Sequence, residues 1–243
     1  MDFSIEWQDR LGSTNAYLKD CFIRDYPINN GNIVAAKEQT AGRGRQDRTW
    51  SSAPNTNLCF SLFVATDAPL DSVSSLTMAA ALAVTETLNA ALIPAAPKWP
   101  NDVLVGNRKI CGILSERVQR NLAPAAGMIV GIGLNVNMSS EEADAIGRPA
   151  TSMLIETGRA HDLNQTLEAL LPNLEFWIEK WQAGGFASLR ETWTQKAGPI
   201  GKPLSVHDGD KRKSGTLAGF GDHGELLLQT DHGIETIWSG DVS

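Results

Sequence analysis

Clustered basic residues are scarce in this chain of 243 residues, and their scarcity argues against nucleic acid as a partner. The sequence holds 21 Lys and Arg against 28 Asp and Glu, which gives a formal net charge of −7. Proteins bind DNA or RNA phosphates through clustered lysines and arginines, and here basic residues gather only in short loops. We therefore expect no nucleic-acid partner.

Cysteines and long apolar runs are also few. The three cysteines, Cys21, Cys59 and Cys111, are odd in number, widely spaced and set among apolar neighbours, which is typical of reduced core thiols. No apolar stretch approaches the roughly 20 residues that cross a bilayer, and no basic segment followed by an apolar one resembles a signal peptide. These absences predict a cytoplasmic protein without a membrane partner.

The overall composition is that of a globular protein. Hydrophobic residues make up 42% of the chain and charged residues 20%, close to the averages for soluble domains. The length suffices for one large domain and a small one with a buried core.

Local patterns predict helices and strands up to about residue 197. Helical spacing and capping predict helices at 13–21, 70–92, 163–181 and 186–196. Apolar runs predict strands at 32–37, 57–64 and 127–136, and a hairpin at 103–114 that turns at Gly106-Asn107. The strand at 127–136 is apolar throughout, so we expect it at the centre of its sheet.

The pattern changes near Ile200. From there short strands alternate with Gly- and Asp-containing turns, and no stretch is long enough for a helix. We predict domains at 1–197 and 198–243, the second a small β-barrel.

The densest chemical signal is the segment from Gln39 to Trp50, QTAGRGRQDRTW, in which Arg43, Arg45 and Arg48 alternate with glycines. Glycines let backbone amides approach an anion, and arginines grip phosphate or carboxylate oxygens with two hydrogen bonds. The segment suits a loop that closes over a triphosphate. Taken alone it is equally well a solvated basic surface loop, and it lacks a Walker A pattern.

A second signal is KWPND at 98–102, followed by Lys109 on the return strand of the hairpin. Asn101 and Asp102 offer the hard oxygens that Mg²⁺ prefers, and Lys109 adds a point charge. The alternative is a strand end with a proline turn and a lysine that protects an exposed sheet edge.

A third pattern, GIGLNVN at 131–137, places asparagines where an apolar strand ends. Such residues face a pocket or start a turn. Two other chemistries find little support in the sequence. The four histidines show no metal-ligand spacing with the cysteines, and there is no Gly-x-Ser-x-Gly nucleophile motif.

Read together and in order, six segments resemble the biotin protein ligase family. They are Gly12-Ser-Thr-Asn15, Gln39-Thr-Ala-Gly-Arg-Gly-Arg45, Trp50, Lys98-Trp-Pro-Asn-Asp102, Arg108-Lys-Ile-Cys-Gly-Ile-Leu114 and Gly131-Ile-Gly-Leu-Asn135. The tail with Gly224-Glu-Leu-Leu-Leu also looks like that family's C-terminal barrel. The resemblance therefore covers the chain from about Ser13 to its end.

The resemblance implies an α+β fold: a catalytic domain with a mixed sheet and helices, then an SH3-like β-barrel. It also implies a reaction in two halves. Biotin and ATP, with Mg²⁺, give biotinyl-AMP and pyrophosphate. A lysine of a biotin carboxyl carrier protein of acetyl-CoA carboxylase, or of a similar biotin-accepting domain, then takes the biotin.

The resemblance also implies roles for individual residues. Lys109 and Arg45 would be catalytic, and Mg²⁺ would arrive with ATP near Asp102. Biotin would be bound by Ser13, Thr14, Asn15, Gln39, Gly42, Arg43, Gly44, Arg45, Lys109 and Gly112. The nucleotide would be bound by Arg48, Trp50, Lys98, Asn101, Asp102 and Asn135. Uncharged Ser13, Thr14 and Gln39 would suit the neutral ureido ring of biotin.

Two features depart from the family pattern. Some members begin with a DNA-binding repressor domain, whereas about a dozen residues precede Ser13 here, so we expect a ligase without repressor activity. Asp47 stands where the family often has glycine. Its Cβ narrows the backbone choices of the loop and would change the energy of loop ordering.

Two rival functions remain open. A lipoate ligase or octanoyl transferase shares the fold, but a lipoate pocket has no ureido ring for Ser13, Thr14 and Gln39 to bind. A non-enzymatic sensor of biotin or nucleotide would have no need of Lys109 and Arg45. For the carrier, we expect docking on an exposed sheet edge, where a homodimer would compete for the same surface.

Overall fold

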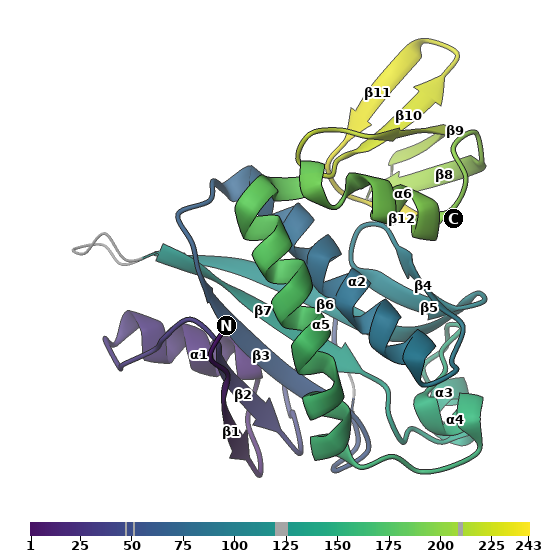
Figure 1. Cartoon of the computed structure of the whole chain (residues 1–243). Coiled ribbons are helices and arrows are strands. Elements are labelled where there is room, and N and C mark those ends of the chain that lie inside the picture. Colours follow the sequence, from purple (N-terminus) through teal and green to yellow (C-terminus); the bar gives the residue numbers. More distant parts are fainter. Residues whose placement is uncertain (47, 51, 120–125, 209–210) are drawn as a thin grey trace.

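A seven-stranded mixed sheet forms the framework of the molecule (Figure 1). The computed structural model describes residues 1–46, 48–50, 52–119, 126–208 and 211–243. The strands are β1 (Ser4–Gln8), β2 (Asn32–Ala36), β3 (Leu58–Ala65), β4 (Ala95–Lys98), β5 (Asp102–Val105), β6 (Arg108–Gln119) and β7 (Ala126–Leu134). Their order is β1-β2-β3-β7-β6-β5-β4. β1 and β2 are parallel and the other neighbours antiparallel, which confirms the mixed sheet with its apolar strand, β7, at the centre.

Helices cover the two faces of this sheet unequally. The long helices α2 (Val73–Ala90) and α5 (Leu163–Gly184) lie together across one face, with the short η1 (Leu70–Ser72) leading into α2 (Figure 1). They bury the main core against β3, β6 and β7. The opposite face carries α1 (Thr14–Ile23), whose Leu18 and Phe22 form a smaller cluster with Phe63 and Ile129. Beyond α1 that second face has space for a pocket.

A second, five-stranded sheet forms the C-terminal part. It follows η2 (Gly185–Ser188) and α6 (Arg190–Ala197) and consists of β8 (Pro203–Asp208), β9 (Lys211–Phe220), β10 (Leu226–Thr230), β11 (Gly233–Ile237) and β12 (Asp241–Val242). The order is β11-β10-β9-β8-β12. The expected all-β tail is therefore present. Among the described residues, however, its sheet is open, and the expected closed barrel is not seen.

Aromatic side chains join the C-terminal sheet to the rest of the molecule. The Trp193 and Phe220 rings meet edge to face with centroids 6.1 Å apart, and Trp99 Nε1 donates to Gly224 O at 2.9 Å. Residues of both sheets belong to one continuous core. The boundary predicted at residues 197/198 stays a prediction.

Most predicted elements are present, with ends that shift by a few residues. The sequence reading missed the edge strands β1 and β4 and the short helices α3 (Ser140–Ala145) and α4 (Met153–Thr157). These elements are too short for a helical or strand periodicity of apolar residues to be recognised in the sequence. α3 does carry a local start signal, the capping box of Ser139 and Glu142.

Within the described residues, none of the helices combines the length and apolar character needed to cross a membrane.

Candidate active site

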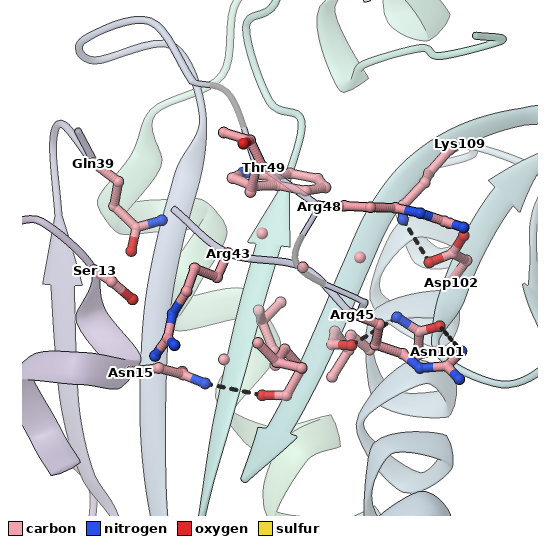
Figure 2. A pocket seen from close by; sticks show the side chains of 18 of the residues that line it. Ser13, Asn15, Gln39, Arg43, Arg45, Arg48, Thr49, Asn101, Asp102 and Lys109 are labelled. Carbon is pink, nitrogen blue, oxygen red and sulfur yellow. Dashed lines mark hydrogen bonds and ion pairs between the residues drawn. The ribbon is translucent and has the colours of Figure 1, made fainter. Parts of the chain in front are cut away.

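A pocket opens on the α1 side of the large sheet, and we call it the main pocket (Figure 2). Its wall comes from the start of α1, the loop of residues 39–46 and 48–50, the strands β3, β5, β6 and β7, and the C-terminal strand β12. The predicted residues that line it are Ser13, Thr14, Asn15, Gln39, Arg43, Gly44, Arg45, Arg48, Trp50, Asn101, Asp102, Lys109 and Gly112. Segments spread over most of the chain therefore meet in one place.

Three glycines make the floor of the main pocket. In the sheet register Gly112 lies opposite Gly133, and Gly131 lies opposite Ser61. Because side chains alternate between faces, all three glycines leave the α1 face of the sheet open. A Cβ on Gly112 would lie 3.0 Å from the Trp50 ring, and one on Gly131 would lie 2.8 Å from Asn15 Cγ. The glycines thus make room for these two side chains.

One end of the main pocket is neutral and polar. Gln39 Oε1 accepts hydrogen bonds from the Thr14 amide at 2.7 Å and the Thr14 hydroxyl at 3.1 Å. Ser13 caps α1, with its Oγ accepting from Ala16 N at 3.4 Å. The Gln39 side chain also interacts with the buried Cys59 thiol. The groups that Ser13, Thr14 and Gln39 bring to this end are amides and hydroxyls, which carry no charge.

Ser61 and Asn15 hold this neutral end in place. Ser61 Oγ lies 2.7 Å from Thr14 Oγ1 and 2.6 Å from Asn15 Oδ1. Asn15 Nδ2 donates to Leu114 O at 3.1 Å and Glu116 Oε2 at 2.8 Å. Both side-chain ends of Asn15 therefore have protein partners, and its 5% exposure leaves little of it to a ligand. The Asn15 side chain thus joins α1 to the sheet through hydrogen bonds.

The other end of the main pocket is cationic (Figure 2). Lys109 Nζ lies 2.6 Å from Asp102 Oδ1 and 5.7 Å from the centre of the Trp50 ring. Arg45 Nη1 donates to Asn101 Oδ1 at 3.2 Å. Burial lowers the pKa of the Arg45 guanidinium from its usual value, while Asp241 and Asp102 oppose this change. Lys109 and Arg45 therefore give this end a positive charge that can bind anionic groups.

A β-bulge brings Lys109 to this end. Lys109 stands three residues before Gly112, so an unbroken strand would place their side chains on opposite faces. The register between β5 and β6 shifts between Val103 and Leu104, which leaves Ile110 as the extra residue. Lys109 consequently reaches the pocket face, and its Nζ would lie 2.9 Å from a Cβ on Gly112.

The loop that carries Arg43, Arg45 and Arg48, which we call the arginine loop (residues 39–46 and 48–50), folds back on itself across the main pocket. Gly44 N donates to Arg48 O at 2.7 Å and Trp50 N to Gly42 O at 2.9 Å. Arg43 Nη2 lies 3.9 Å from Glu116 Oε1. Asp47, expected to narrow the loop's backbone choices, lies outside the described residues.

Arg48 links the loop to the C-terminal sheet. Its guanidinium forms an ion pair with Asp241 of β12. The hydrogen bond from Arg48 lowers the pKa of the Asp241 carboxyl, and the charges of Arg48, Arg45 and Lys98 act in the same direction against burial. A carboxylate from the C-terminal sheet therefore belongs to the wall of the main pocket.

A second hollow adjoins the main pocket, and we call it the side cavity. It shares Arg48, Thr49, Trp50, Lys109 and Arg148 with the main pocket and adds Asn135, Glu142, Ala145, Ile146, Gly147 and Ala150. Asn135 is buried, and its Nδ2 donates to Thr151 O at 3.0 Å.

The cysteines are placed as unreactive thiols. Cys59 and Cys111 are buried and Cys21 is partly buried, and all three are free. Burial raises the pKa of the Cys59 and Cys111 thiols, so both are protonated at neutral pH. Among the described residues, no three His, Cys, Asp or Glu side chains gather as metal ligands would.

Comparison with known proteins connects this geometry to a family. The sequence model of the biotin/lipoate A/B protein ligase family matches residues 7–135. The chain is also 33% identical over 238 residues to the bifunctional ligase/repressor BirA of Bacillus spizizenii, covering 97% of this chain and 72% of that protein. The chain belongs to the biotin/lipoate A/B protein ligase family.

Further members of this family are similar over nearly the whole chain. The biotin--[acetyl-CoA-carboxylase] ligase of Paracoccus denitrificans is 34% identical, covering 86% of this chain and 88% of that one. The solved biotin protein ligase of Aquifex aeolicus in complex with biotin and ATP superposes with a TM-score of 0.78 at 28% identity, covering 98% and 97% of the two chains. The α+β fold is therefore that of biotin protein ligases.

Within this ligase fold, three of the predicted site residues lie outside the main pocket. Gly42 is buried within the arginine loop, where a Cβ would lie 2.6 Å from Trp50 O. Lys98 is half-buried at the end of β4. Asn135 lines the side cavity instead.

The sequence analysis missed Ser61, which supports Thr14 and Asn15 from behind the main pocket, and several residues of the pocket wall. Ser61 had a signal, because it is a lone hydroxyl in the apolar strand LCFSLFVA. Gly131 and Gly133 were noticed, but not as an open floor. Arg148 and Asp241 are isolated charges in loops and short strands, and no local pattern points to them.

Proposed function

We propose that this protein is an enzyme that activates biotin with ATP and transfers it to a lysine of a carrier protein. The Paracoccus and Bacillus relatives are named as ligases, and the similar Aquifex structure holds biotin and ATP. The product of the first half-reaction is biotinyl-AMP. The expected acceptor is the biotin carboxyl carrier protein of acetyl-CoA carboxylase or a similar biotin-accepting domain.

The main support is that the main pocket is neutral at one end and cationic at the other. Thr14 and Gln39 lie at the neutral end, where the uncharged ureido ring needs matched donors and acceptors. Lys109 and Arg45 lie at the other end, where the biotin carboxylate and the ATP phosphates bring negative charge. A single pocket therefore suits both ends of biotinyl-AMP.

The first half-reaction forms one bond and breaks another at the α-phosphorus. An oxygen of the biotin carboxylate attacks the α-phosphorus, and the bond to the β-phosphate oxygen breaks to release pyrophosphate. Lys109 and Arg45 neutralise charge that gathers between the two anions in the transition state. Trp50, Arg48, Asn101 and Asn135 hold the nucleotide, with Lys98 more distant.

Mg²⁺ fits this arrangement as a partner of the ATP phosphates. Asp102 supplies one carboxylate next to Lys109, and Mg²⁺ is commonly held by one or two carboxylates together with substrate phosphates. When bound, the ion offsets phosphate charge. In the second half-reaction the carrier lysine's amine attacks the acyl carbon, AMP leaves with the bonding electron pair, and the amine loses a proton.

A lipoate ligase or octanoyl transferase is the competing function in this family. Its acyl chain carries no acceptor for the amide N–H groups of Gln39, and a polar donor left unpaired beside an apolar ligand costs binding energy. The deciding experiment measures pyrophosphate release from ATP with biotin and, separately, with lipoate. We expect pyrophosphate release with biotin but not with lipoate, followed by biotin transfer to a carrier domain. Pyrophosphate release with lipoate but not with biotin would reverse the assignment. Biotin binding without pyrophosphate release would favour a sensor.

Further proposals concern the rest of the molecule. We infer that residues 198–243 are an SH3-like barrel domain, that the enzyme is cytoplasmic, and that its acidic balance keeps nucleic acid from binding.

The exposed edge strand β1 is the proposed docking edge for the carrier and for a homodimer. Unimpaired biotin transfer by Ile5→Lys, which charges this edge, would argue against that docking.

A further inference from the structure

Arg148 differs from the other cations of the main pocket because none of the residues that the structure describes pairs with its side chain. Lys109 pairs with Asp102, Arg48 with Asp241, Arg45 with Asn101, and Arg43 lies near Glu116. No hydrogen bond or ion pair joins the Arg148 side chain to another described residue. Its guanidinium therefore keeps all its donors for a ligand or for water.

The position of Arg148 is fixed although its side chain is exposed. Gly147 adopts a left-handed conformation with φ of 73° after α3, and Pro149 restricts the backbone of Arg148 from the other side. The next residues are hydrogen-bonded to the backbone of Lys109. Lys109 N donates to Pro149 O at 3.0 Å, and Thr151 N donates to Lys109 O at 2.9 Å. Arg148 therefore precedes a segment whose backbone is hydrogen-bonded to Lys109, the central lysine of the site.

Arg148 also lies at the junction of the two hollows. Of the residues that the structure describes, it is one of five, with Arg48, Thr49, Trp50 and Lys109, that line both the main pocket and the side cavity. An acyl-adenylate that fills both hollows must place its phosphate at their junction, because the phosphate links the acyl group to the nucleoside. The pyrophosphate, by contrast, leaves this junction.

We propose that Arg148 binds the α-phosphate of ATP and then the same phosphate in the acyl-adenylate, which it retains until the carrier arrives. This inference rests on the proposed function and adds a phosphate-binding residue to it. The guanidinium offers paired N–H donors to phosphate oxygens. Because Arg148 is exposed, water screens the contact, and we expect a moderate effect rather than the loss of activity that removal of Lys109 would cause.

The experiment compares Arg148→Gln, Arg148→Lys and the control Arg159→Gln in the full chain. Arg159 is also exposed and charged, but it lines neither hollow. We expect Arg148→Gln to release preformed biotinyl-AMP about tenfold faster than wild type, equivalent to about 1.4 kcal/mol. The KM for ATP should rise by a similar factor, and the Kd for biotin alone should not change. Arg148→Lys should recover part of both effects, and Arg159→Gln should match wild type.

The possible results separate this inference from the proposed function. If wild type makes no biotinyl-AMP, the proposed function fails before any variant is compared. If wild type makes it and Arg148→Gln retains it as long as wild type does, Arg148 is a solvated surface residue and the inference is wrong. A raised KM for ATP with unchanged retention would place the contact on the departing phosphates and would also overturn it. Weaker biotin binding together with a lower melting temperature would show that the substitution disturbs the hydrogen bonds between the Pro149–Thr151 segment and Lys109. That result would count against the inference.

Discussion

Lys109 is the side chain whose charge is most directly placed for chemistry. Its ammonium is mostly buried, lies 2.6 Å from Asp102 and stands over the floor of the main pocket. A cation held in place before the reaction stabilises developing negative charge without having to reorganise. The Asp102 carboxylate keeps the ammonium oriented while the pocket is without an anion.

The first prediction is that Lys109→Ala slows adenylate formation far more than it weakens biotin binding. Loss of one preorganised charge contact costs roughly 3 kcal/mol, or on the order of a hundredfold in rate. Single-turnover formation of biotinyl-AMP measures the rate, and calorimetry measures biotin binding. Lys37→Ala, which removes an exposed lysine paired with Asp9, is the control. A Lys109→Ala enzyme as fast as wild type would remove Lys109 from the mechanism.

The second prediction concerns recognition of the neutral ring by Gln39. Gln39→Glu keeps an oxygen for the Thr14 amide and hydroxyl but removes the amide donor and adds a charge. A buried ligand group left without its hydrogen bond costs about 1–3 kcal/mol, so biotin affinity should fall about ten- to a hundredfold. The KM for ATP should stay the same. Gln165→Glu, an equal change at an exposed position, should alter neither, and wild-type biotin affinity in Gln39→Glu would refute the assignment.

At the scale of elements, the site depends on strands that have glycine at the positions that face the main pocket. Gly112 and Gly133 face each other across β6 and β7, and together they leave room for the Trp50 ring. A Cβ on Gly133 would lie 2.8 Å from Trp50 Nε1. Since an indole ring is rigid, such a Cβ would displace Trp50 and the loop that carries it.

The third prediction is that Gly133→Ala weakens nucleotide binding while the sheet still folds. Displacement of Trp50 from the junction of the two hollows should raise the KM for ATP about five- to thirtyfold, because stacking and cation–π contacts on one aromatic ring contribute about 1–2 kcal/mol. Gly12→Ala is the matched control, since a Cβ there meets nothing within 4 Å. If both variants kept the wild-type KM, the glycine floor would have no role in seating Trp50.

Elements with a strong local signal could be predicted from the sequence, and those without one could not. β7 is a long apolar run, and it was expected at the centre of the sheet where it lies. β1 has mostly exposed residues and gains its place by pairing with β2, which no local pattern records. The bulge at Ile110 is equally hidden, although it decides which face Lys109 takes. Lys109 was singled out as a charge on the return strand of the hairpin, and its role came from the resemblance to a family, but neither predicts which face of the sheet its side chain takes.

At the scale of the whole molecule, the C-terminal sheet completes a site that the large sheet begins. Arg48 and Asp241 stand 193 positions apart in the sequence, yet their side chains pair at the wall of the main pocket. Trp99, two residues before Asn101 in the chain, donates a hydrogen bond to Gly224 O of the C-terminal part. Long-range contacts of this kind depend on how the two sheets pack, so motif reading alone could not find Asp241.

The last prediction is that Asp241→Asn removes the ion pair with Arg48 and lowers the stability of the protein by an amount that depends on pH. The folded-state pKa of Asp241 is lowered from 3.8, first by the hydrogen bond from Arg48. A lowered carboxyl pKa means that its stabilising contribution is present above about pH 4 and disappears as the pH falls through the folded-state pKa. Because both side chains are nearly half exposed, 45% and 48%, the pair contributes at most about 1 kcal/mol.

In a chain of this size that energy corresponds to a melting temperature lowered by up to about 2–4 °C at neutral pH. The difference between wild type and Asp241→Asn should narrow below about pH 4, where wild-type Asp241 also loses its charge. At neutral pH the variant should also raise the KM for ATP, because Arg48 loses the partner that orients it toward the nucleotide. Asp222→Asn, which breaks another exposed pair, with Arg190, controls for the general effect of removing a carboxylate. A melting difference that stays constant from pH 7 to pH 3 would mean that the Asp241 charge does not fasten the two sheets together.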